Sequence, residues 1–325
     1  MLKLFQNTKP TTVLLIILLG FVMKWQAFVY PIFPEVSKGH FMFDLILGCL
    51  KILFGKSAIS FSFLSVSLLI AQSYYLNFIV SKHKLFVLKG FLPAFSFLLL
   101  TSLFPSLNYF NEQLILNFFV LAAFEKILGF SHSSNSRTEI FNAGFLMTIP
   151  FLFQLSGFGF WVLFFVSLAL LRPFHLAEWV VGIIGLFTPI YFFVCSLFLF
   201  NKMEVLHQFP LLSFNYLQSA DFKRFHFGLL LGFFLLIAFG LFALLQNLPK
   251  VTIYVRRSWL IVVSYCMLAI GILFLITPTA NQGWILVLPP LCLIISQSFC
   301  LEKTKWFSSF TFYFSIVLFI FSQLI

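Results

Sequence analysis

A series of long apolar runs constrains this chain more than any other feature of its sequence. Eleven such runs, separated by short polar or basic segments, cover most of the 325 residues. A helix needs roughly 20 residues to cross the hydrocarbon core of a bilayer, and lipid offers backbone groups no hydrogen-bond partners, so the spanning segments must be helical. The pattern predicts an all-α, polytopic transmembrane helical bundle with about 11 spans, within a range of roughly 9–12 because several runs are short.

The composition leads to the same conclusion. The chain is 61% hydrophobic and only 9% charged, whereas about 25% of the residues of a soluble domain are charged. No stretch is polar enough to fold separately in water, so we expect a single integral-membrane domain over residues 1–325. The expected spans are residues 11–30, 57–80, 90–104, 113–129, 139–155, 160–171, 179–200, 228–245, 259–276, 284–299 and 306–325.

Two longer segments, residues 31–56 and 201–227, mix charged and apolar side chains and are expected to be outer interfacial segments. In the first, polar or small residues are spaced four, three and four positions apart, which puts them on one face of a helix. They are Asp44, Gly48, Lys51 and Gly55. A short amphipathic helix with such a face is expected to lie in the membrane interface.

The distribution of basic residues predicts the orientation. The net charge is +11, and twelve Lys and Arg residues fall in loops assigned to the inner side against six on the outer side. Because Lys and Arg accumulate in cytoplasmic loops, we expect a multi-pass membrane protein with a cytoplasmic N-terminus. Lys24 and Trp25 are interpreted as anchors at the outer end of the first span. Membrane lipid is the expected partner, and no nucleic-acid partner is expected.

The two outer segments carry the first candidate site. One contains Glu35, His40 and Asp44. The other contains Glu204, His207, Asp221 and His226. We hypothesise that Asp44, Glu204 and Asp221 act as catalytic carboxylates, one of them as a base, and that Glu35 and the three histidines bind the substrate. Such a site would hold a divalent metal or a lipid-linked substrate; the alternative is that these side chains are simply solvated at the level of the lipid headgroups.

The second candidate site is a short inner hairpin with Arg172, His175 and Glu178. Glu178 is expected to pair with Arg172 or with Arg137. One interpretation is a cytoplasmic substrate site, and the other is a structural staple that fixes the topology, with Arg172 inside and Trp179 in the aromatic belt.

Prolines within the apolar runs suggest a third possibility. They are Pro93, Pro150, Pro189 and the pair Pro289-Pro290. Breaks in membrane helices can mark transporter sites, but kinks relieved by neighbouring helices are the interpretation that we favour. The sequence has no P-loop, GxSxG, HExxH or dinucleotide fingerprint, and no spacing in it is a recognised metal-ligand motif, so we assign no metal ligands and no cofactor.

One sequence motif carries a resemblance to a known family. It runs from Phe141-Asn142-Ala143-Gly144 through Arg172-Pro173-Phe174, then Glu178-Trp179 and Gly185 to Pro189. This motif resembles an uncharacterised multi-pass inner-membrane family of Bacteroidetes, whose span pattern fits most of the chain. The resemblance implies a location in the bacterial inner (cytoplasmic) membrane. The family has no established activity that could be assigned to this chain. Members sometimes carry a carotene-cleaving label, but the six histidines are expected to be divided equally between the two sides of the membrane, which disfavours a shared iron site.

Three functions follow from these observations. The first is a membrane partner or assembly subunit of the cell envelope, without catalysis, which would bind other envelope membrane proteins. The second is a glycosyltransferase- or polymerase-like enzyme that acts on a polyprenyl-linked glycan at the outward-facing site. This second reading rests on a loose resemblance of the outer amphipathic segments to such enzymes. The third is a transporter.

Overall fold

The computed structural model describes residues 2–5, 10–34, 40–55, 57–87, 90–131, 136–208, 224–273, 280–301 and 305–324, which form helices and turns with no strand among them. The α-helices are α1 (Leu2–Phe5), α2 (Pro10–Met23), α3 (Gln26–Val29), α4 (Phe41–Phe54), α5 (Ala58–Lys82), α6 (Leu92–Ser102), α7 (Glu112–Leu128), α8 (Ser136–Phe153), α9 (Gly159–Leu171), α10 (Leu176–Leu199), α11 (Arg224–Asn247), α12 (Ile253–Leu273), α13 (Ala280–Gly283), α14 (Leu288–Phe299) and α15 (Lys305–Leu324). The 3-10 helices are η1 (Pro105–Asn108), η2 (Gly129–Ser131), η3 (Leu155–Phe158), η4 (Met203–Gln208), η5 (Leu248–Lys250) and η6 (Trp284–Leu286).

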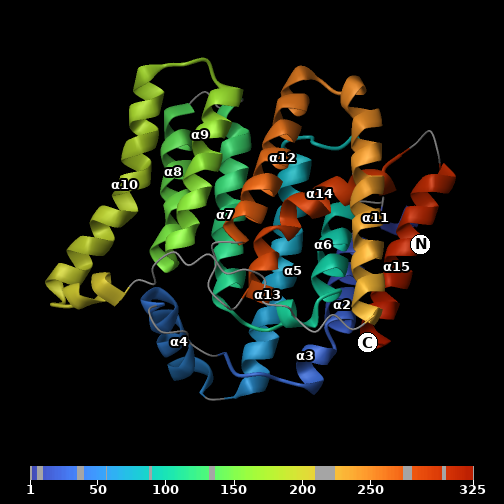
Figure 1. Ribbon diagram of the computed structural model, residues 1–325, viewed down its shortest axis with the longest axis horizontal. Coiled ribbons are helices and arrows are strands. Elements are labelled where there is room, and N and C mark those ends of the chain that lie inside the picture. Colours follow the sequence, from blue (N-terminus) through green and yellow to red (C-terminus); the bar gives the residue numbers. More distant parts are fainter. Residues whose placement is uncertain are drawn as a thin grey trace.

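The longer helices form one bundle with two distinct ends (Figure 1). Helices α8, α9 and α10 lie on one side, α11 and α15 lie on the other, and α5, α6, α7 and α14 lie between them. The α9–α10 and α11–α12 connections share one end, which we call the Arg172 end. Helices α3 and α4 lie at the opposite end, which we call the His40 end because His40 immediately precedes α4.

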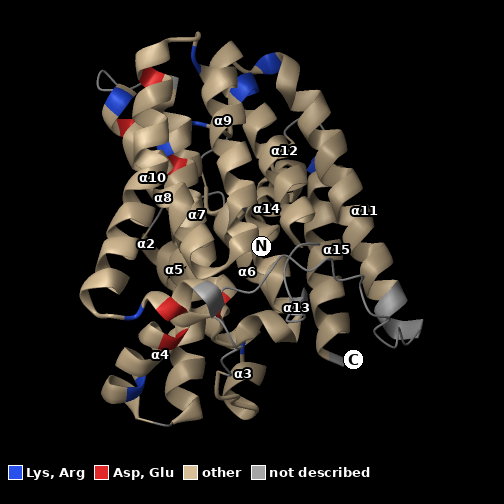
Figure 2. Ribbon diagram, turned by 60° about the vertical axis from the view of Figure 1, so that its left-hand side comes forward, with Lys and Arg blue, Asp and Glu red and all other residues tan. Residues whose placement is uncertain are grey.

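The predicted all-helical fold is confirmed for the described residues. Each of the eleven expected spans overlaps a helix, namely α2, α5 to α12, α14 and α15. Five helical stretches, in α5, α10, α11, α12 and α15, are long and apolar enough to cross a membrane. Charged residues gather toward the two ends of the bundle, and a band of other residues separates them (Figure 2).

The shortest helices of the bundle are also its most buried. Every residue of α6 and of α14 is buried, and the two helices pack against each other. At 1.5 Å per residue, helices of 11 and 12 residues extend only about 16–18 Å. Pro93 and the Pro289-Pro290 pair lie in their first turns, where proline is readily accommodated. The expectation that these prolines break helices was therefore wrong, whereas Pro150 and Pro189 do lie inside α8 and α10.

Helices α8 and α10 pack closely because glycines line their contact. A Cβ atom built on Gly185 would lie 2.6 Å from the Phe141 carbonyl oxygen, and one on Gly144 would lie 2.9 Å from the Gly182 carbonyl oxygen. The Thr148 hydroxyl donates to the Leu186 carbonyl oxygen across the same contact, at 2.8 Å. Small residues that let helix backbones approach are typical of helix packing in membranes. The Phe141–Gly144 and Gly185–Pro189 parts of the sequence motif thus form this contact.

Buried amides connect the middle helices. Gln72 of α5 donates to the Leu114 carbonyl oxygen of α7 at 2.6 Å and accepts from Asn117 at 2.9 Å. Gln113 of α7 donates to Gln154, which follows α8, at 2.6 Å. In an apolar surrounding, hydrogen bonds between side chains and neighbouring helices fix one arrangement of the bundle.

Candidate functional site

The start of α7 carries an acidic residue that the sequence reasoning overlooked. Asn111 caps the helix, because its side-chain oxygen accepts from the Leu114 amide at 2.8 Å, as N-cap residues do. Glu112 follows at the first helical position, where the helix dipole favours negative charge, and is only 8% exposed. Its Oε2 atom lies 2.5 Å from Nδ1 of His40, which is 5% exposed.

His40 and Asp44 belong to the start of α4, and the structure brings them together. The Asp44 amide donates to the His40 carbonyl oxygen at 3.0 Å, and the Asp44 side chain is exposed on the predicted polar face of α4. Contact with the Glu112 carboxylate raises the pKa of His40, with a smaller contribution from Asp44, while burial acts in the opposite direction. An imidazole beside a carboxylate can hold a proton or pass it on.

Lys24 forms a second polar cluster at the His40 end. It lies in the turn after α2 and is fully buried, with its ammonium group donating to Asn108 Oδ1 at 2.7 Å, Thr101 Oγ1 at 2.9 Å and Ser102 Oγ at 3.3 Å. Three acceptors match the three donors of an ammonium group. The interpretation of Lys24 as an interfacial anchor was therefore wrong, although its neighbour Trp25 is exposed.

The connection between α6 and α7 joins these clusters. Asn108 of η1 accepts from Lys24 through its side chain, and its carbonyl oxygen accepts from Ser65 of α5 at 2.7 Å. Four residues later, Glu112 contacts His40. The available sequence signal was the pair Asn111-Glu112 before an apolar run, which is typical of a helix start.

The two predicted outer segments meet through a cation–π contact and a shared apolar cluster. Lys202 lies 5.9 Å from the centre of the Phe41 ring. Val205 of η4 and Phe41 of α4 both pack on a small apolar cluster built around Leu152. Glu204, also on η4, is exposed.

The structure does not place the side chains of the remaining predicted outer residues. Glu35 and Asp221 lie outside the described residues, as do the side chains of His207 and His226. Among the residues that the structure describes, no group of three or more His, Cys, Asp and Glu is arranged to hold a metal ion.

At the Arg172 end, the predicted hairpin forms between α9 and α10. Arg172 Nη1 lies 3.8 Å from Glu178 Oε1, and Ser136 Oγ donates to the same oxygen at 3.2 Å. Glu178 is buried, whereas His175 is exposed. The ring of Trp179 stacks on Phe165. The contact with Arg172 was one of the two that we expected for Glu178.

More ion pairs connect neighbouring helices at this end. Glu125 of α7 contacts Lys82 of α5 and lies 3.6 Å from Lys126, which in turn lies 3.4 Å from Glu139 of α8. These contacts link α5, α7 and α8 at the Arg172 end.

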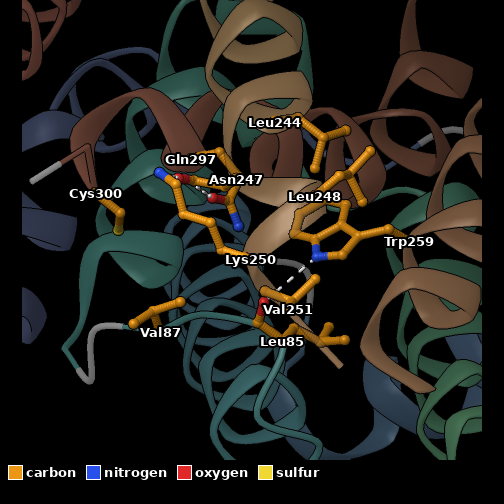
Figure 3. A pocket seen from close by; sticks show the side chains of 10 residues that line it. All are labelled: Leu85, Val87, Leu244, Asn247, Leu248, Lys250, Val251, Trp259, Gln297 and Cys300. Carbon is orange, nitrogen blue, oxygen red and sulfur yellow. Dashed lines mark hydrogen bonds between the residues drawn. The ribbon is translucent and has the colours of Figure 1, made fainter. Parts of the chain in front are cut away.

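A cavity of about 160 Å³ opens among α11, η5, α12, α14 and the segment after α5 (Figure 3). Its wall is mainly apolar, with a few polar side chains. The lining residues are Leu85, Val87, Leu244, Asn247, Leu248, Lys250, Val251, Trp259, Gln297 and Cys300. None of them was proposed as a site residue from the sequence.

Comparison of the chain with protein-family models, with curated proteins and with solved structures found no match.

Proposed function

We propose that this chain crosses the bacterial inner membrane eleven times, with its N-terminus and its Arg172 end in the cytoplasm, and serves the cell envelope as a non-catalytic membrane partner or assembly subunit. The charge-poor band between the two charged ends (Figure 2) and the five long apolar helices support membrane insertion. The excess of basic residues in the loops of the Arg172 end supports the orientation. The motif at the α8–α10 contact is our reason for placing the chain with the Bacteroidetes family.

One observation supports a non-catalytic role most directly. Each carboxylate that is buried among the described residues contacts a basic side chain of the same chain. The three pairs are Glu112 with His40, Glu125 with Lys82 and Glu178 with Arg172. Charged groups within a membrane bundle that pair with one another hold helices in register, and such groups are already engaged before any substrate arrives.

In-cell photo-crosslinking from α10 tests this proposal. A photoreactive residue at Tyr191, which is 66% exposed, should form an adduct with a discrete protein, whereas one at Leu186, which is 1% exposed, should react only within the chain. A chain that purifies alone from mild detergent and forms only lipid adducts would count against a partner role.

A second candidate function is the enzyme acting on a polyprenyl-linked glycan, and it is favoured by the His40–Glu112 pair beside exposed Asp44. Under this alternative, alanine at Asp44, Glu204 or Asp221 abolishes activity without loss of folded protein. If all three variants leave the cell-envelope glycans unchanged, this alternative is rejected. The transporter hypothesis has lost part of its basis, because Pro93 and Pro289-Pro290 begin helices.

A further inference from the structure

The cavity at the Arg172 end combines an apolar wall with a cationic side chain at its edge. Lys250 Nζ donates to Asn247 Oδ1 at 3.2 Å, and Asn247 Nδ2 donates to Gln297 Oε1 at 3.1 Å. Lys250 uses one of its three donors in this contact and is exposed. Figure 3 shows Lys250, Asn247 and Gln297 together along one wall of the cavity, with Trp259 across from them.

Two more basic residues are close in the sequence to residues that line this cavity. Lys84 directly precedes the lining residue Leu85, and Arg256 lies three positions before Trp259 on α12, close to one helical turn. Both side chains are exposed. Positive charges near each other add to the local potential and attract an anion.

The wall of the cavity opposite the Lys250 ammonium group is apolar and can contact a hydrocarbon group. Leu244, Leu248 and Val251 supply aliphatic surface, and Trp259 supplies an indole whose N–H donates to the Leu85 carbonyl oxygen at 3.3 Å. An apolar cavity of about 150 Å³ is large enough for a benzene-sized group. The space therefore admits one part of an amphiphile, such as the first carbons of a chain, and leaves its charged group at the edge.

We propose that this cavity binds an anionic phospholipid, with the phosphate at Lys250 and Asn247 and the adjoining glycerol and first chain carbons against Leu248, Val251 and Trp259. Basic pockets between membrane helices on the cytoplasmic side bind anionic lipid headgroups. The proposal requires that the bundle is embedded in a membrane, as proposed above, but it does not depend on a partner role. A soluble phosphate ester shares the headgroup chemistry, and the test separates the two sources.

The test measures lipid retained by the purified full-length chain, by native mass spectrometry after extraction in mild detergent and exchange into phosphatidylglycerol or phosphatidylcholine. Two changes at Val87, a lining residue that is 71% exposed, form a matched pair. Val87→Glu places a negative charge at the cavity edge, and Val87→Lys places a positive one. Lys250→Glu removes the proposed phosphate contact, and Lys202→Glu changes an exposed lysine at the other end.

Phosphatidylglycerol should be retained in preference to phosphatidylcholine by wild type and by the variants Val87→Lys and Lys202→Glu. The amount of retained phosphatidylglycerol should fall at least about fivefold in Val87→Glu and in Lys250→Glu, because one basic residue near an anionic surface contributes an effect of that size. Equal retention of both lipids, or unchanged retention in both acidic variants, would overturn the proposal. Displacement of the lipid by glycerol 3-phosphate alone would overturn the lipid assignment in favour of a soluble phosphate ester. Detergent extraction of the same samples reports separately on membrane embedding.

Discussion

His40 Nδ1 lies 2.5 Å from Glu112 Oε2, and this contact joins the start of α4 to the start of α7. The two residues are 72 positions apart in the sequence, and both side chains are buried. The contact therefore attaches an amphipathic helix at the His40 end to the central bundle.

This contact predicts a stability that depends on pH. The pKa of His40 is raised in the folded chain by Glu112, so the contribution of His40 is fully present below the unfolded value of about 6.5 and is lost as the pH rises through the folded pKa. Burial raises the pKa of Glu112, so the contact also weakens at acid pH, where this carboxylate becomes protonated. The stability of wild type relative to Glu112→Gln should be largest near pH 6 and should decrease above about pH 6.5. Unfolding of the detergent-solubilised chain across this range measures the difference, with exposed Glu204→Gln as control; a difference independent of pH would contradict the assignment.

Lys24 should show the opposite dependence. Burial lowers the pKa of Lys24 from 10.5 to about 7, so the folded chain releases this proton at a lower pH than the unfolded chain does. The cost of burying the cation is then relieved as the pH rises above about 7. As the pH rises above about 7, the free energy of unfolding of wild type should increase relative to that of Lys24→Met by up to about 1.4 kcal/mol per pH unit. The variant Lys51→Met, at an exposed lysine, is the control and should show no such trend relative to wild type. Parallel curves for wild type and Lys24→Met would show that the lysine remains charged throughout.

The glycines between α8 and α10 predict a steric effect. Alanine at Gly185 would place a Cβ atom 2.6 Å from the Phe141 carbonyl oxygen, which must separate the helices and cost about 1–3 kcal/mol. Gly271 of α12 has no such neighbour within 4 Å, so Gly271→Ala should be neutral or stabilise the helix by up to about 1 kcal/mol. Thermal unfolding, followed by the reaction of buried Cys266 and Cys292 with a thiol dye, measures both variants. Equal melting temperatures would show that the helices tolerate the added methyl group.

The Arg172–Glu178 contact predicts coupling between two residues of the hairpin. Arg172→Ala leaves a buried carboxylate without its cation and should cost about 1–3 kcal/mol. Replacing Glu178 by Gln in the same chain removes that charge and should restore part of the loss, which a double-mutant cycle measures. If the two single effects simply add, then the contact does not stabilise the hairpin.

The sequence was sufficient to predict where helices form, because an apolar segment in lipid must satisfy its own backbone hydrogen bonds and therefore folds as a helix. It was less informative about how the first span ends. The run over residues 11–30 reads as one helix, but α2 ends at Met23, and Lys24 turns inward to Thr101, Ser102 and Asn108. Those partners are at least 77 positions away, so no local pattern could reveal them.

The candidate site shows the same limit. His40 was chosen as a histidine in an outer acidic segment, but its partner Glu112 was missed, because the acid stands alone before an apolar helix and the pairing is long-range. Arg172 was one of the two partners expected for Glu178, and the structure has this contact, which joins residues only six positions apart within one hairpin. Local spacing predicts local contacts, whereas contacts between distant segments depend on how the helices pack.

The orientation of the bundle is the central claim, and two cysteine positions test it most directly. Cys49 is an exposed residue of α4 at the His40 end, and Ala177→Cys places a thiol on the exposed surface at the start of α10. A membrane-impermeant maleimide added to spheroplasts should label Cys49, with Cys49→Ser as control, and should label the cysteine at 177 only after the inner membrane is opened. Labelling of position 177 in intact spheroplasts, with Cys49 protected, would reverse the orientation and contradict the account.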